Sequence, residues 1–188
     1  MHRAGARLAA GISALLLAAL TGCGPGEAEI VTQSDDTRDV VFSTAAEVAA
    51  SIERDYADAG VSVVHFPDVE DRWSQCSDDL VADTEVPTAI QWSSHWWFDF
   101  DPRRETASLI EEVAAPYVAD GWEPGRELLS DGGGRSVAFH KNGYVMRLGG
   151  MLEADPDRVS SFGLTVTGPC IPAPQDIREW TAAGTPAP

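Results

Sequence analysis

The sequence predicts an α+β fold, in which two helices pack on one face of a mainly antiparallel β-sheet that is closed by one disulfide bond. Two segments carry apolar residues at helical spacing, and each precedes segments in which apolar and polar residues alternate as they do in strands. The dipeptide Asn142-Gly143 lies between two strand-like segments and is the strongest hairpin signal in the chain. These observations favour a sheet that is covered by helices on one side.

The first predicted helix runs from Thr44 to Gly60. Thr44 and Glu47 have the spacing of a capping box, in which side chains satisfy free N–H groups at the start of a helix. Apolar residues then recur at helical intervals: Ala45, Val48, Ala49, Ile52, Tyr56 and Ala59. Gly60 ends the helix, and the β-branched residues of Val61–Phe66 predict a short strand.

Alternation over Val86–Phe100 predicts a long strand, with Ser93-Ser94 as the point where it could break. One face of this strand carries the apolar residues Val86, Ile90, Trp92, Trp96, Phe98 and Phe100. Asp101-Pro102 predicts the start of the second helix, with an N-cap followed by proline at the first helical position. The apolar stripe of this helix consists of Ala107, Ile110, Val113, Ala114 and Tyr117. Pro116 is expected to kink or end it.

The remainder of the chain is rich in predicted strands, which cover Trp122–Leu129, Ser136–Lys141, Tyr144–Leu152 and Ser161–Thr167. A turn is expected at Asp131–Gly134. Residues 173–188 are rich in Pro and Ala and predict a C-terminal tail, with a short helical piece around Ile177–Trp180.

The composition limits the number of domains and the kind of macromolecule that the protein can bind. The chain has 188 residues, of which 44% are hydrophobic, and a formal net charge of −17. This is enough apolar material for one core, which we expect to form a single α+β domain over residues 43–172. The acidity argues against a nucleic-acid partner, because binding to phosphates depends on an excess of Lys and Arg.

Residues 1–22 have the features of a secretory signal peptide that is cleaved from the mature protein. A basic start precedes the apolar run Leu8–Leu20, which is too short to span a bilayer as a helix. The segment ends in Leu20-Thr21-Gly22-Cys23, which resembles a bacterial lipobox. We therefore expect fatty acyl chains such as palmitate to be attached at Cys23.

The predicted anchor has consequences for location and for the residues that follow it. Two or more acyl chains give stable membrane binding, and an acidic body is repelled by anionic lipids, so covalent lipid must hold this protein at the membrane. The expected location is the extracytoplasmic face of the cell membrane. Residues 23–42 are rich in Gly, Glu, Ser and Asp and predict a flexible tether.

Cys76 and Cys170 remain as an even pair once Cys23 is lipidated. In an oxidising compartment such a pair predicts a disulfide bond. The alternatives are a reactive thiol or a metal site, but neither cysteine has C-x-x-C spacing or a nearby cluster of cations that would stabilise a thiolate. The bridge removes a cysteine nucleophile from the available mechanisms.

Six features along the chain resemble the LppA-like lipoproteins of actinobacteria. They are the lipobox cysteine, Cys76 in a polar loop, His95–Phe100 before a helix, Ala114–Tyr117 at the end of that helix, the hairpin at Asn142–Tyr144, and Thr165–Cys170. The resemblance spans most of residues 43–172. It implies an exported, lipid-anchored α+β domain, and it carries over no catalytic residue.

His95, Trp97 and Asp99 form a candidate binding patch, because a regular strand places them on the face opposite Trp96 and Phe98. An exposed tryptophan beside a histidine can stack on a sugar or on an aromatic side chain of a partner. The alternative is that both faces of the strand are covered and Trp97 belongs to the packing. A catalytic pair of His95 and Asp99 is disfavoured, because four residues along a strand separate them by ~13 Å.

Histidines and acids offer two further candidates, both for metal ions. His65 and His140 lie in predicted strands and could meet across the sheet. An acidic segment supplies oxygen ligands suited to Ca²⁺ but lacks the spacing of a calcium-binding loop. It contains Asp68, Glu70, Asp71, Asp78, Asp79, Asp83 and Glu85. The glycines before Arg135 lack the spacing of a phosphate-binding loop and predict a turn. We expect no metal and no cofactor.

The motifs of several enzyme classes are missing from the sequence, including G-x-S-x-G, H-E-x-x-H and S-x-x-K. The favoured interpretation is a non-enzymatic, lipid-anchored module that binds a protein or a glycan of the cell envelope. The alternatives are an envelope hydrolase built on dispersed carboxylates or histidines, and a structural accessory subunit of an envelope complex. A cleft with convergent ionisable groups would favour the enzyme, and an exposed aromatic patch would favour the binding module.

Overall fold

The structure is a computed structural model that describes residues 25–66, 70–76, 87–129, 134–150 and 158–182. Its elements, in chain order, are α1 (Glu27–Asp55), the 3-10 helix η1 (Ala57–Ala59), β1 (Val61–Val64), β2 (Arg72–Gln75), β3 (Ala89–Glu105), α3 (Thr106–Ala119), β4 (Glu123–Leu129), β5 (Arg135–Lys141), β6 (Tyr144–Gly150), β7 (Arg158–Thr167), β8 (Ile171–Pro172) and α4 (Gln175–Ala182).

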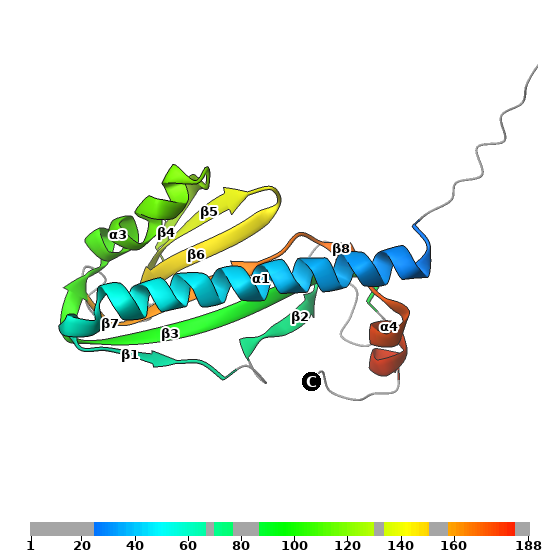
Figure 1. Ribbon diagram of the computed structural model, residues 1–188, viewed down its shortest axis with the longest axis horizontal. Helices are drawn as coiled ribbons and strands as arrows, with labels where there is room; N and C mark the ends of the chain where they lie inside the picture. The colour runs from blue at the N-terminus through cyan, green and yellow to red at the C-terminus, as the bar shows by residue number, and fades with distance from the viewer. Residues whose placement is uncertain (1–24, 67–69, 77–86, 130–133, 151–157, 183–188) are drawn as a thin grey trace, which may run out of the picture.

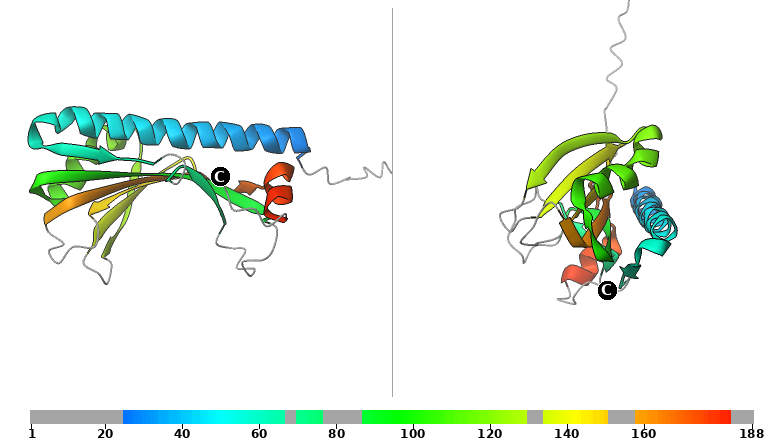
Figure 2. Two further views of the ribbon diagram at one scale, coloured as in Figure 1. Left: turned by 90° about the horizontal axis from the view of Figure 1, so that it is seen from below. Right: turned by 90° about the vertical axis from the view of Figure 1, so that its left-hand side faces the viewer.

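The described strands form one eight-stranded sheet with antiparallel pairings. The main order is β1-β3-β7-β6-β5-β4, and β2 and β8 both pair with the first residues of β3. Helices α1 and α3 share a core with β3, β6 and β7 on one face of this sheet, and α1 lies along its length (Figure 1; Figure 2). The predicted α+β class is confirmed. No helix in the described part of the chain is long and apolar enough to cross a membrane.

Helix α1 begins at Glu27, so the prediction of a flexible tether over residues 23–42 is wrong from that residue onward. Thr44 consequently lies inside the helix and not at its N-cap. The buried positions in this first half of α1 are Ser34, Thr37 and Val41, which have helical spacing. Two of the three are hydroxyl residues, which count as polar in a periodicity search, so the helical stripe is hidden in the sequence.

Small residues bring α1 close to the sheet. The indole N–H of Trp92 donates to Ser34 Oγ at 3.1 Å, which satisfies a side chain that is only 3% exposed. A Cβ atom at Gly168 would lie 2.7 Å from Thr37 Cγ2, so the contact requires glycine at this position. Because a polar segment of this length is a marginal helix in isolation, we attribute its helicity to these tertiary contacts.

Strand β3 confirms the predicted alternation, since its buried side chains on the helix-covered face are Ile90, Ser94, Phe98 and Phe100. The strand does not break at Ser93-Ser94. It also continues through Asp101-Pro102, so the predicted helix start at that dipeptide is wrong. Pairing of Arg104 and Glu105 with β7 keeps this segment extended.

Helix α3 starts at Thr106, with Glu105 as its N-cap. The Glu105 carboxylate accepts hydrogen bonds from the backbone N–H groups of Ala107 at 3.2 Å and Ser108 at 2.7 Å. The helix passes through Pro116 and ends at Ala119, so Pro116 does not terminate it. Proline in the last turn removes one helical hydrogen bond near an end that is exposed to solvent, which limits its cost.

We expect Glu105→Gln to lower the melting temperature modestly at about pH 7 and to have no effect in acid. Hydrogen bonds from the Ser108 hydroxyl, the Ser108 N–H and the Ala107 N–H hold the pKa of Glu105 below its ordinary value of 4.5. A carboxyl whose pKa is depressed by folding stabilises the protein above its unfolded pKa, and this contribution disappears as the pH falls through the folded pKa. Thermal denaturation of both proteins over a pH series measures the difference. A difference that stays constant down to low pH would contradict the assigned cap.

The predicted hairpin is confirmed between β5 and β6. Asn142 and Gly143 have φ values of 51° and 85°, so both central residues of the turn are in the left-handed region. This is the geometry of a type I′ turn, whose twist matches that of the flanking strands. The pair Lys141 and Tyr144 closes the ladder at the turn.

The predicted disulfide between Cys76 and Cys170 is also confirmed. Beside it, a second hydrophobic cluster is formed by Ile90, Ile171, Ala173 and Ile177. Ile177 belongs to α4, so the described part of the predicted tail packs against the domain. The carboxylate of Glu27 accepts the backbone N–H of Gln175 and pairs with Arg178 at 3.1 Å, which joins the first residue of α1 to α4. Residues 183–188, the signal peptide and Cys23 lie outside the described residues.

Candidate functional site

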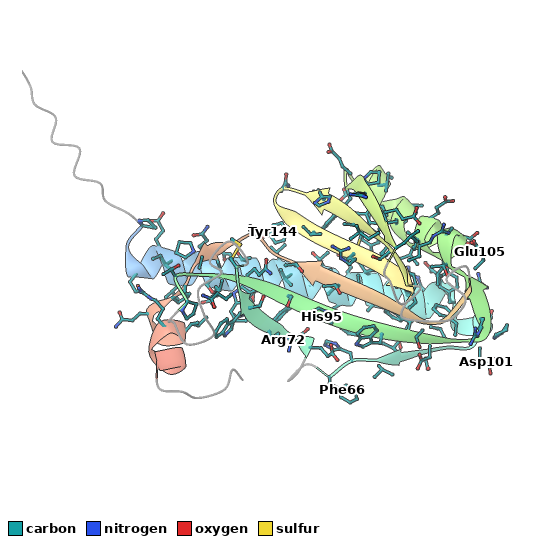
Figure 3. All side chains as sticks on the ribbon, turned by 180° about the vertical axis from the view of Figure 1, so that it is seen from behind. Phe66, Arg72, His95, Asp101, Glu105 and Tyr144 are labelled. Carbon is teal, nitrogen blue, oxygen red and sulfur yellow. A yellow bond between two sulfur atoms is a disulfide. The ribbon has the colours of Figure 1, made fainter. Side chains whose placement is uncertain are left out.

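The sheet face opposite α1 and α3, which we call the open face, carries the three residues of the predicted binding patch. Figure 3 views the sheet from this side, with α1 behind it and His95 near the middle of β3. Strand pairing aligns side chains of this face in rows across the sheet. One row consists of His95, Thr165, Arg147 and Ala138. The next consists of Trp97, Gly163, Gly149, Ser136 and Leu128.

A groove of about 520 Å³ lies over these rows. This open-face groove is lined by Trp97, Leu128, Leu129, Gly134, Ser136, Arg147, Gly149, Gly150, Gly163 and Thr165. Its volume is in the range of small-molecule and peptide pockets. Leu128 and Leu129 are 42% and 69% exposed, whereas Trp97 is half-buried. Exposed leucines and an aromatic ring in a concave site are typical of a binding surface.

Glycine on β7 makes room for the Trp97 side chain. A Cβ atom at Gly163 would lie 3.2 Å from Trp97 Cζ3, so the indole rests against the backbone of the neighbouring strand. The indole therefore covers part of the open face and forms one wall of the groove. Because it is only half-buried, it still presents aromatic surface to an occupant.

Arg147 is the only charged side chain among the described residues that line the groove. It is half-buried, and no carboxylate or hydrogen-bond acceptor in the described part of the chain is paired with its guanidinium. Nearby cations differ in this respect, since Arg135 pairs with Glu127 at 2.6 Å and Lys141 pairs with Asp120 at 2.6 Å. The groove thus combines apolar walls with one arginine that is available to an anion.

The other two residues of the predicted patch do not line the groove. His95 Nδ1 lies 3.1 Å from Thr165 Oγ1, and burial lowers the pKa of His95, which keeps its imidazole neutral at physiological pH. Asp99 accepts a hydrogen bond from Ser161 Oγ at 2.6 Å, two residues farther along β3 than Trp97. The three side chains share one face, and Trp97 alone among them contacts the groove.

A polar cluster at the outer edge of β3 has no clear signal in the sequence. His65 stacks on Trp96 with ring centroids 3.8 Å apart, and its Nδ1 lies 2.8 Å from the backbone oxygen of His95. His65 Nε2 lies 3.2 Å from Asp71 Oδ2, and the hydroxyl of Ser94 donates to the other oxygen of Asp71. The only hint in the sequence is that hydroxyl and acidic residues stand beside predicted strands.

This cluster contains the residue types of a hydrolase triad in a different order. Asp71 lies between Ser94 and His65, so the serine proton is directed at a carboxylate and not at the imidazole. Ser94 is also only 1% exposed, which leaves no room for a substrate at its hydroxyl. A serine nucleophile needs a base in direct contact with its Oγ. The contacts of this cluster instead hold β3 against the residues that precede β2, and we assign the cluster a structural role.

The structure separates the two histidines that we considered as metal ligands. His65 follows β1, whereas His140 belongs to β5, and β3, β7 and β6 lie between those strands. No group of three His, Cys, Asp or Glu side chains suited to a metal ion occurs within the described residues. Most of the acidic segment lies outside them, namely Asp68, Asp78, Asp79, Asp83 and Glu85, and so does most of the predicted turn at Asp131–Gly134.

Comparison with known proteins finds limited similarity. No protein-family model matches the chain, and no curated protein sequence matches it. One similar solved structure is a crystal structure described as that of the lipoprotein LppA from Mycobacterium tuberculosis. The two chains are 19% identical, the TM-score is 0.34, and the alignment covers 86% of this chain and 99% of that chain. Similarity at this level transfers no residue role to this chain.

Proposed function

We propose that this protein is a lipid-anchored lipoprotein of the cell envelope that binds a polypeptide partner in the open-face groove. The observation that carries the proposal is the groove itself, in which Trp97, Leu128 and Leu129 stay accessible on the sheet face opposite the described helices α1 and α3. A folded protein usually covers aliphatic and aromatic surface of this kind unless a partner does so. In this proposal the protein performs no chemistry on what it binds.

A protein segment suits the groove better than a neutral glycan does. A sugar ring can stack on Trp97, but its hydroxyls would also lie against Leu128 and Leu129, where they find no hydrogen-bond partner. An apolar side chain of a polypeptide loses no hydrogen bonds in the same place. The hydroxyl of Ser136 remains available to the backbone of such a segment, whereas that of Thr165 already contacts His95.

In this proposal, only a few residues separate the lipid anchor at Cys23 from the folded domain. Lipid on Cys23 would leave three residues before Glu27, where α1 begins. Four residues of chain span at most ~14 Å, so the folded body would stay near the bilayer surface. Helix α1 has 29 residues and is about 43 Å long, which would keep its far end and the adjoining strands at a defined distance from its anchored end.

A hydrolase receives less support from the same contacts. His65, Asp71 and Ser94 come together with the carboxylate in the centre, and the groove contains no carboxylate among its described lining residues. An accessory subunit of an envelope complex is a special case of the proposal, in which the groove serves as the docking surface.

A photoreactive benzophenone side chain installed at position 128 is expected to crosslink a discrete partner in native membranes. The matched control is position 118 on α3, because Val118 and Leu128 are both 42% exposed but lie on different elements of the fold. Trp97→Ala should reduce the crosslink at least about tenfold, as expected when an aromatic hot spot is removed, with only a small change in melting temperature. Equal crosslinking from the two positions would contradict the proposal. A large loss of melting temperature in Trp97→Ala would assign this residue to the core.

A further inference from the structure

We infer that the open-face groove selects a polypeptide segment that carries a carboxylate beside an apolar side chain, with Arg147 as the partner of the carboxylate. This inference rests on the proposed function and adds the chemistry of the ligand to it. The carboxylate belongs either to an acidic side chain or to the C-terminus of the bound segment, because both present the same planar pair of oxygens.

Arg147 has no partner among the described residues, although acidic residues are abundant in the sequence. The chain has 30 acidic and 13 basic residues. Arg147 nevertheless lies half-buried on the open face without a carboxylate, among the described residues. Partial burial of a charge is unfavourable unless the charge is paired, and a bidentate carboxylate is the anion that fits a guanidinium best. A ligand that supplies this group gains a charge-assisted contact that the free protein lacks.

The position of Arg147 relative to the apolar walls limits the spacing of the ligand groups. Arg147 and Gly149 are two residues apart on β6, so the row of Arg147 and the row of Trp97 are about 7 Å apart. Consecutive Cα atoms of a ligand are 3.8 Å apart. A carboxylate on the same residue as the apolar side chain, or on one of its neighbours, can therefore reach Arg147 while the apolar group lies against Trp97.

The charges of the protein limit the charge of the ligand. His95 lies in the same row as Arg147 but is neutral, and Arg147 is the one charged side chain among the described residues that line the groove. The net charge of −17 repels a polyanion at long range. One carboxylate flanked by apolar groups matches one arginine flanked by Trp97, Leu128 and Leu129.

The test uses the full chain labelled with ¹⁵N and two probes, N-acetyl-leucyl-phenylalanine and its C-terminal amide. The probes have identical apolar groups and differ only in the carboxylate. The indole N–H signal of Trp97 is assigned by its loss in Trp97→Phe, and its shift during titration reports occupancy of the groove. The acid is expected to bind about tenfold more tightly than the amide, which is the usual effect of a hydrogen bond to a charged group.

Variants connect this difference to Arg147. Arg147→Gln should weaken binding of the acid to the level of the amide, and Arg147→Lys should recover part of the loss. The charge-matched control is Arg54→Gln, because Arg54 lies on α1, on the helix-covered side of the sheet, and is exposed there. Arg54→Gln should leave both affinities unchanged. Dispersed spectra of all variants establish that they are folded.

Several outcomes would overturn the inference. If the acid and the amide both shift the Trp97 signal and bind with equal affinity, the groove binds the apolar groups but does not select for a carboxylate. An acid preference that survives in Arg147→Gln would assign the anion to another residue. Preferential binding of glucuronate, added as a third probe, would replace the polypeptide by an acidic glycan. No Trp97 shift with any probe would refute the inference, while the crosslink from position 128 decides separately on the proposed function.

Discussion

Replacing both Cys76 and Cys170 with serine is expected to lower the free energy of unfolding by about 2–5 kcal/mol. The two cysteines are 94 residues apart, and closing a loop of this length restricts the unfolded chain by at most ~4.7 kcal/mol in the chain-entropy model. For a chain of this size, such a loss lowers the melting temperature by roughly 10 °C. It is the largest effect on stability that we expect from a change outside the main core.

The position of the bridge makes part of this loss local. Cys76 follows β2 and Cys170 precedes β8, and both strands pair with the first residues of β3. The small hydrophobic cluster of Ile90, Ile171 and Ile177 lies in the same region and is separate from the main core. Hydrogen exchange in the double variant should therefore increase first in β8 and α4 and only later in the centre of the sheet.

Chemical denaturation of the double variant and of the wild type, with and without reductant, measures this effect. Reduced wild type should unfold at the same denaturant concentration as the double variant, which separates loss of the bond from loss of the cysteine side chains. If reduction and substitution both leave the unfolding midpoint unchanged, then the disulfide does not contribute to stability.

Cys23→Ala is expected to abolish labelling by a fatty-acid analogue and to move the protein from the membrane fraction to the soluble fraction. The effect should be all or none, because the acidic body is repelled by anionic lipids and has no other predicted attachment to the bilayer. Metabolic labelling followed by fractionation of the cell envelope measures both properties in one experiment.

The double variant at Cys76 and Cys170 is the matched control, because it removes two cysteines but keeps the predicted acceptor of the lipid. It should be labelled to the same extent as the wild type. Equal labelling of Cys23→Ala and wild type would remove the anchor, and with it the proposed location at the extracytoplasmic face of the membrane.

Strands and tight turns were largely predictable from the sequence. The alternation along β3 identifies its buried face, and Asn142-Gly143 identifies the hairpin between β5 and β6, because both signals depend on neighbouring residues. Helix boundaries were less accurate. Asp101-Pro102 has the composition of a helix start, but pairing with β7 extends β3 to Glu105. The hydrogen bonds between β3 and β7 outweigh the preference of these residues for a helix N-terminus.

The first half of α1 illustrates the same limit. Residues 27–42 have the polar composition of a linker, and their helicity depends on contacts with Trp92 and Gly168, which lie far away in the sequence. Serine and threonine at buried positions are favourable only where a partner satisfies them or a glycine lets the backbone approach. Neither condition is visible in a window of neighbouring residues.

The candidate site was predictable only in part. The alternation of side chains along β3 correctly places His95, Trp97 and Asp99 on one face of the sheet. It does not distinguish Trp97, which lines the groove, from Asp99, which is hydrogen-bonded to Ser161. Arg147 had no signal at all. An arginine becomes a candidate ligand only when the residues around it are known to leave it without a partner, and those residues come from four different strands.

The linear order of residues was sufficient to predict the pairing of Cys76 with Cys170 and the alternation of the central strand, which the structure confirms. It also predicts the export signal and the lipid-acceptor cysteine, and these stay predictions. Each of these depends on counts or on short-range spacing. The tertiary structure decided the length of α1 and the hydrogen-bonded cluster of His65, Asp71 and Ser94. It also decided the groove and its arginine, which has no partner among the described residues. Each of these brings together residues of separate strands and helices, and only the packing of the sheet determines which of them meet.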